Sequence, residues 1–153
     1  MDKNYKVIEK GDYEVIIENV EEKIFKSGNK GFNIRFRIRT DVKQKFANRI
    51  LFDNLVLTNK SLWKISNLFL AVGIKEKEED KITAKPNEFP SLLEGKNLIV
   101  TVNPQLVHYK GKEVIQERVV AYKKSEVGEI ELAEEELEEF LEKEIDFDEE
   151  LIF

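Results

Sequence analysis

Four of the five arginines in this chain lie within fifteen positions of one another. They are Arg35, Arg37, Arg39 and Arg49, in a sequence whose 25 basic residues are otherwise almost all lysine. Arginine carries a planar fork of donors that binds phosphate through two hydrogen bonds and can also stack on a base. The cluster therefore favours a nucleic-acid-binding surface, although an outward row of arginines can also serve only as a solvated face.

Lysines and aromatic residues accompany the arginines in segments that are expected to be loops or strand ends. An aromatic side chain there can stack on a nucleobase, and each stacked base contributes about 1–3 kcal/mol whatever its identity. Phe25, Phe46 and Tyr109 are the aromatic candidates, and Phe46 could instead pack beneath its own loop. The complete set of residues predicted to bind DNA is Lys26, Lys30, Arg35, Arg37, Arg39, Lys43, Lys45, Phe46, Arg49, Tyr109, Lys110 and Lys112.

The charge of the chain is divided between a basic body and an acidic end. Residues 1–124 hold 24 Lys/Arg against 17 Asp/Glu, a net charge of +7, whereas residues 125–153 hold one lysine against fourteen acidic residues, a net charge of −13. A basic body with an acidic arm points to a polyanionic partner, with the arm as its competitor or as a docking peptide. The residues predicted to dock a protein partner are Phe147, Leu151, Ile152 and Phe153. The alternative is an arm that only increases solubility.

Hydrophobic patterning predicts five strands and one helix. Strands are expected over residues 11–25, 32–39, 49–56, 97–102 and 114–122. The second has the cleanest alternation: one face is apolar, and the opposite face, with Arg35, Arg37 and Arg39, is expected to be wet and basic. A helix is expected over residues 61–72, capped by Thr58 or Asn59 and stopped by Gly73. Periodicity predicts a core position for Phe32, Phe36, Phe52, Trp63 and Phe69.

The order of these elements predicts a mainly β fold. Three strands, a helix and two strands within about 110 residues match a five-stranded Greek-key barrel of the OB type, with one helix between strands three and four. A small mixed α+β sandwich gives a similar order. Residues 1–124 are expected to form this domain, and residues 125–153 an acidic tail that is partly helical or disordered.

Composition argues against most enzymes and against a membrane protein. The chain has no cysteine and a single histidine, His108, so thiolate chemistry and the usual zinc or copper sites are excluded. No cofactor or metal is expected, and Asp53 has no second carboxylate at a spacing that suggests a Mg²⁺ site. No segment has the length of an apolar membrane span, so a cytoplasmic location is expected.

Four segments carry a resemblance to a known family. They are residues 11–15, the turn at residues 26–29, residues 41–49 followed by Phe52 and Asp53, and the helix that ends at Gly73. Over about residues 8–122 the chain resembles a phage and prophage family that was long described as a domain of unknown function. Its members are often labelled single-stranded DNA-binding proteins. The acidic tail with an aromatic end resembles the tails by which bacterial and phage single-strand binding proteins dock replication and repair enzymes.

These observations lead to an expected function and two rivals. We expect a non-enzymatic protein that binds single-stranded DNA in phage replication or recombination, in the host cytoplasm, with a tail that competes with DNA and docks partner enzymes. One rival is an adaptor or DNA mimic that acts through the tail, and the other is a small Mg²⁺-dependent nuclease. A homodimer is possible through Ile16 or the Trp63 side of the helix.

Overall fold

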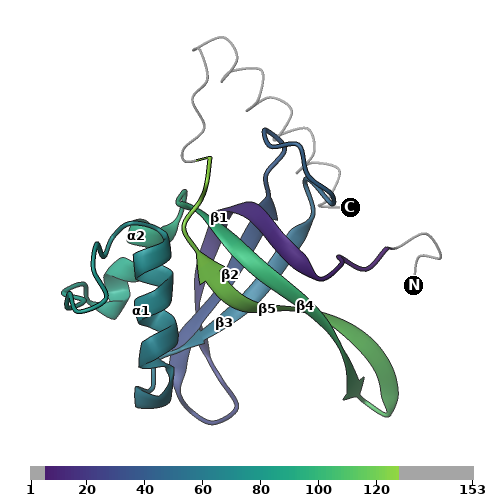
Figure 1. Cartoon of the computed structure of the whole chain (residues 1–153). Coiled ribbons are helices and arrows are strands. Elements are labelled where there is room, and N and C mark those ends of the chain that lie inside the picture. Colours follow the sequence, from purple (N-terminus) through teal and green to yellow (C-terminus); the bar gives the residue numbers. More distant parts are fainter. Residues whose placement is uncertain (1–5, 128–153) are drawn as a thin grey trace.

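The computed structural model describes residues 6–127 of the 153-residue chain, which form a five-stranded antiparallel sheet beside two short helices (Figure 1). The strands lie in the order β3-β2-β1-β4-β5. Their bounds are β1 Gly11–Ile24, β2 Lys30–Ile38, β3 Ile50–Val56, β4 Asn97–Tyr109 and β5 Lys112–Lys123. The predicted mainly β class and the order of three strands, a helical region and two strands are thus confirmed.

The sheet is curved, so that its two edge strands approach each other. Register shifts at residues 17–19 of β1 and at residues 101–102 of β4 accompany this curvature. The Tyr122 hydroxyl on β5 donates a hydrogen bond to the Asp53 carboxylate on β3, and the Lys64 Nζ atom lies 2.9 Å from the same carboxylate. No ladder of backbone hydrogen bonds joins β3 to β5 within the described residues, so the sheet stays open along this seam.

The helical region contains one α-helix and two 3₁₀ turns more than the sequence predicted. The 3₁₀ turn η1 (Asn59–Ser61) leads into α1 (Leu62–Ala71), and Gly73, with φ +82°, follows the end of the helix as predicted. The turn η2 (Pro86–Glu88) then leads into the short helix α2 (Phe89–Leu93). The sequence predicted no helix between residue 73 and the fourth strand. Proline is tolerated in the first turn of a helix, where its missing N–H has no partner in any case, so Pro90 does not interrupt α2.

The last two strands are longer than predicted and form a projecting arm (Figure 1). Residues 103–109 and 112–113 were expected to be connection, yet they continue the β4–β5 ladder to Tyr109 and Lys112. Lys110 and Gly111 have φ values of 50° and 75°, which suit a two-residue hairpin turn whose twist matches that of the strands. The turn lies between the two predicted strands, but both strands were predicted too short.

The core lies between the concave side of the sheet and the two helices. Phe32, Phe36 and Phe69 are buried there as predicted. The predictions for Phe52 and Trp63 were wrong, because both side chains are more than half exposed. On β3 the side chains of Leu51 and Leu55 are buried, so Phe52, which alternates with them, lies on the outer face. Among residues 6–127, no helix is long and apolar enough to cross a membrane.

Candidate nucleic-acid interface

Two of the four clustered arginines are buried in ion pairs. Arg37 donates from Nε and NH2 to the two oxygens of Glu18 on β1, at 2.7 and 2.8 Å, and only 3% of the residue is exposed. Arg39 is equally buried and donates to both oxygens of Asp41 at 2.9 and 2.6 Å. The prediction that these two side chains are exposed to solvent was wrong. Strand alternation places their side chains on the outer face, but carboxylates from neighbouring segments cover them there.

Arg35 shares the Glu18 carboxylate but is more accessible. Its NH2 atom lies 3.0 Å from Glu18 Oε1, and 39% of its side chain is exposed. Burial alone would raise the pKa of Glu18, but the hydrogen bonds and positive charges of Arg37 and Arg35 outweigh it and lower the pKa. Glu18 therefore stays ionised and holds both guanidinium groups in place. Of the three arginines on or directly after β2, Arg35 is the most available to a ligand.

Arg49 and Phe46 pack on each other at the end of the 41–48 loop. The Arg49 guanidinium lies 5.8 Å from the centre of the Phe46 ring, with its NH2 atom 3.6 Å from Glu117 and 3.0 Å from the Lys6 carbonyl oxygen. The other contact of Phe46 is an edge-on packing against Tyr13 at 6.2 Å. Phe46 is thus partly built into the core, which limits the ring surface that it offers to a base.

The predicted lysines lie on three separate segments of the chain. Lys26 and Lys30 are exposed at the β1–β2 hairpin, Lys43 and Lys45 on the loop after β2, and Lys110 and Lys112 at the tip of the arm. The first two places are at opposite ends of β2, which at nine residues is about 30 Å long. Lys110 lies over the exposed Tyr109 ring at 5.3 Å, and Lys45 faces Glu9 at 3.3 Å. A ligand that touches all three places must therefore cross the sheet.

A groove of about 430 Å³ runs between β3 and β5, and the sequence did not predict it. Phe52 lies in it with 56% of the residue exposed, directly opposite Arg35 in the β2–β3 register. Because opposed residues in an antiparallel pair share a face, this ring and the Arg35 side chain lie side by side on the outer surface. The other residues that line the groove are Asn33, Asp53, Asn54, Lys64, Gln116, Glu117, Arg118 and Val119.

Most of the groove is polar, and its polar groups are already oriented. The Asn33 Nδ2 atom donates to Asn54 Oδ1 at 2.9 Å, and the Arg118 Nη1 atom donates to Gln105 Oε1 at 3.3 Å. Burial raises the pKa of Tyr122 well above its ordinary value, with a further contribution from Asp53, so that hydroxyl remains protonated and donates across the seam. Asp53 is bound by Lys64 and Tyr122. No group of three or more metal-binding side chains was found in the described part of the chain.

The root of the acidic tail is attached to the body of the protein. The Ser125 hydroxyl donates to Glu14 Oε1 at 2.6 Å, and the Glu126 backbone N–H donates to Glu14 Oε2 at 2.9 Å. Glu14 also forms a weak ion pair with Arg39, whose Nη1 atom lies 4.0 Å from Glu14 Oε1. The Gln44 side chain of the 41–48 loop hydrogen-bonds both the N–H and the carbonyl oxygen of Glu14, so the tail leaves the body beside this loop. The residues predicted to dock a partner, Phe147 and 151–153, lie outside the described residues.

Comparison with known proteins gives a family but no activity. Residues 2–131 match the model of a family that is described as a protein of unknown function. No curated protein matches the chain.

Proposed function

The chain belongs to that family, DUF669, and on this premise we propose that it binds single-stranded DNA without catalysing a reaction. The observation that carries the proposal is the exposed Phe52 ring beside Arg35 in a groove of hydrogen-bonding side chains. An aromatic platform beside a guanidinium group suits a stacked base and its phosphate. With 56% of the residue exposed, the Phe52 ring is accessible to a base on the outer face of β3.

We interpret the fold as an OB-type Greek-key barrel that is open along one seam. If β3 were paired with β5, the observed strand order would close into a five-stranded barrel, with α1 between β3 and β4. In that fold the surface of strands two and three binds single strands, flanked by the loops between strands one and two and between strands four and five. Arg35, Phe52 and the predicted lysines of both hairpins occupy these positions.

The nucleic acid would cross the sheet from one hairpin to the other. Lys26 and Lys30 would hold phosphates at the β1–β2 hairpin, and Tyr109 with Lys110 and Lys112 would hold the strand at the arm. Between them Phe52 would stack on a base, and Arg35 would bind a phosphate next to it. Arg37 and Arg39 would act indirectly, by keeping Glu18 and Asp41 from repelling the strand.

The tail would regulate this surface and recruit partners. Its net charge of −13 complements the +7 of the body, and its root is fixed at Glu14 on the same sheet. We propose that it competes with DNA for the lysines and, once displaced, offers Phe147 and residues 151–153 to replication or recombination proteins of a phage in the host cytoplasm. The resemblance to phage single-strand binding proteins supports this part of the proposal.

A fluorescence-anisotropy titration with a labelled dT oligonucleotide tests the proposal. We expect saturable binding that weakens with salt, with a slope of log affinity against log salt of about −3 to −4 if five phosphates are held. Arg35→Ala should weaken binding, and labelled DNA should stay intact with Mg²⁺ present. The absence of saturable binding at low salt would refute the proposal.

One observation favours the rival adaptor function. The ion pairs of Arg37 and Arg39 leave less accessible positive charge on the sheet than the sequence suggests. In an adaptor the barrel would be a scaffold, and the acidic tail would bind a basic protein or mimic DNA. An adaptor should show no saturable DNA binding in the titration described above.

A further inference from the structure

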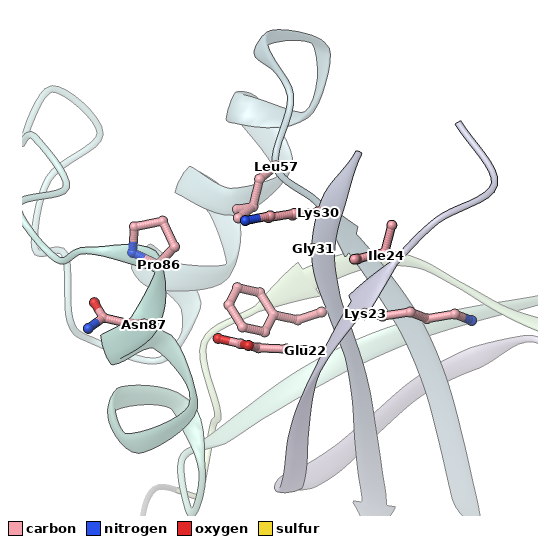
Figure 2. A pocket seen from close by; sticks show the side chains of 9 residues that line it. Glu22, Lys23, Ile24, Lys30, Gly31, Leu57, Pro86 and Asn87 are labelled. Atoms are coloured by element: carbon pink, nitrogen blue, oxygen red, sulfur yellow. The ribbon is translucent and has the colours of Figure 1, made fainter. Parts of the chain in front are cut away.

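A second cavity, separate from the groove between β3 and β5, lies where β1 and β2 meet the helical region (Figure 2). Its volume is about 500 Å³. Glu22 pairs with Phe32 and Ile24 with Lys30 in the β1–β2 register, so all four side chains share the concave face of the sheet. The cavity is therefore the open end of the core, beyond the buried Phe32 ring.

The cavity combines an apolar floor with a polar rim. Phe32, Leu57 and Pro86 provide apolar surface, and Ile24 on its edge is 70% exposed. Figure 2 shows Lys30 beside Leu57, with Pro86 and Asn87 on the opposite wall. Such a site accepts an apolar or aromatic group that carries a negative charge at one end.

An open strand edge adjoins the cavity. Within the described residues, β4 pairs with β1 only over residues 11–16. Beyond them, on the edge of β1 away from β2, Ile17 donates its N–H to the Lys96 carbonyl oxygen and accepts at its own carbonyl oxygen from the Gly95 N–H. The Val20 N–H donates to the Glu94 carboxylate. No strand of residues 6–127 neighbours Glu22 and Ile24 on that side. An extended peptide can add to such an edge through its backbone and place alternate side chains in a pocket.

We propose that this cavity binds the C-terminal tip of the same chain, residues 151–153, with the Phe153 ring on the apolar floor. The carboxylate of Glu150, which directly precedes the tip, would pair with Lys30, and Asn87 would donate to the peptide. Glu22 can accept a backbone N–H from the tip, which makes its negative charge compatible with this ligand. The acidic residues that precede the tip match the exposed lysines around the opening, among them Lys26 and Lys85.

The length of the tail matches the distance that it must span. Its root lies at Glu14 and the cavity at Glu22 and Ile24, eight to ten residues along β1, which corresponds to about 27–33 Å. Twenty-six residues follow Val127, and a flexible chain of that length has a root-mean-square extent of about 26–31 Å. The effective concentration of a tethered ligand is highest when these two lengths agree. The proposal holds whether or not the protein binds DNA, because site and ligand belong to one chain.

A spin label on the tail of the full-length protein tests the proposal. The chain has no cysteine, so Glu149→Cys gives one labelling site next to the tip. We expect loss of amide signal intensity in the spectrum of the ¹⁵N-labelled protein at Gly31, Leu57 and Asn87. Phe153→Ala and Lys30→Glu should each restore these signals, whereas Lys77→Glu, the same charge change away from the cavity, should not.

Three outcomes would overturn the proposal. The first is signal loss confined to residues 41–48, which would place the tip at the loop beside the tail root. The second is no localised loss at all. The third is signal loss at the cavity that persists when ¹⁵N-labelled protein without a spin label is mixed with spin-labelled protein that carries no ¹⁵N, which would assign the tip to a second copy. DNA titration of the same sample reports separately on the proposed function.

Discussion

Replacing Phe52 by alanine should weaken DNA binding strongly and leave the fold almost unchanged. The ring is 56% exposed on the outer face of β3, so its removal opens no cavity in the core and should cost under about 1 kcal/mol of folding free energy. If it stacks on one base, its loss removes about 1–3 kcal/mol of binding free energy, which corresponds to a roughly 5- to 150-fold weaker affinity. Phe52→Trp should retain the affinity, because it keeps an aromatic platform.

The assay is anisotropy with a dT oligonucleotide at fixed low salt, accompanied by urea unfolding of each variant. Leu62→Ala is the matched control, because Leu62 is an apolar side chain that is also 56% exposed but lies on α1. It should leave the affinity within about twofold of wild type, a difference of about 0.4 kcal/mol. If Phe52→Ala binds as tightly as Leu62→Ala, the groove between β3 and β5 does not hold a stacked base, and the reasoning that carries the proposed function fails.

Three further predictions concern the ion pairs and the tail. Arg37→Ala should lower the free energy of unfolding in urea by about 3 kcal/mol. This is the lower end of the range for breaking a buried pair, because Glu18 still has its ion pair with Arg35. A loss of stability no larger than that caused by Arg35→Ala would contradict this prediction. The pKa of Glu18 is lowered in the folded protein, so its contribution to stability is fully present above the ordinary glutamate pKa of about 4.5. That contribution is lost as the pH falls through the lowered pKa. Acid should therefore destabilise wild type more than Glu18→Gln, as measured by urea unfolding between pH 7 and pH 3. Deleting residues 128–153, which spares the hydrogen bonds of Ser125 and Glu126 to Glu14, should tighten oligonucleotide binding at low salt, and unchanged or weaker binding would argue against competition by the tail.

The sequence predicts the strands well wherever one face of a strand meets the core. Phe32 and Phe36 alternate with polar residues over the whole of β2, and this period-two pattern is independent of what lies on the other face. The β4–β5 arm was predicted too short for the opposite reason. Its residues beyond Pro104 pack against no core, so Leu106 and Ile115 are exposed and give no alternation to follow.

The fate of outward-facing residues depends on neighbours that are distant in the sequence. The solvent exposure of Arg37 depends on Glu18, which reaches it only because of the β1–β2 register and the irregularity at residues 17–19. Phe52 was placed in the core because every nearby residue of β3 except Asp53 and Asn54 is apolar. The polar Asp53 lies on the inner side, where Tyr122 and Lys64 bind it, so the apparent phase of the strand was reversed.

The ion pairs also determine where the free energy of DNA binding would come from. A guanidinium group that is already neutralised by a buried carboxylate releases few counterions when a phosphate approaches, so Arg37 and Arg39 should add little to the salt dependence. The phosphates must then be held mainly by lysines that lie at separate places on the sheet, each of them exposed and each worth little alone. A single lysine variant should therefore change the affinity less than Phe52→Ala does. The opposite order, with Lys30→Ala or Lys110→Ala more damaging than Phe52→Ala, would mean that charge and not stacking dominates the interface.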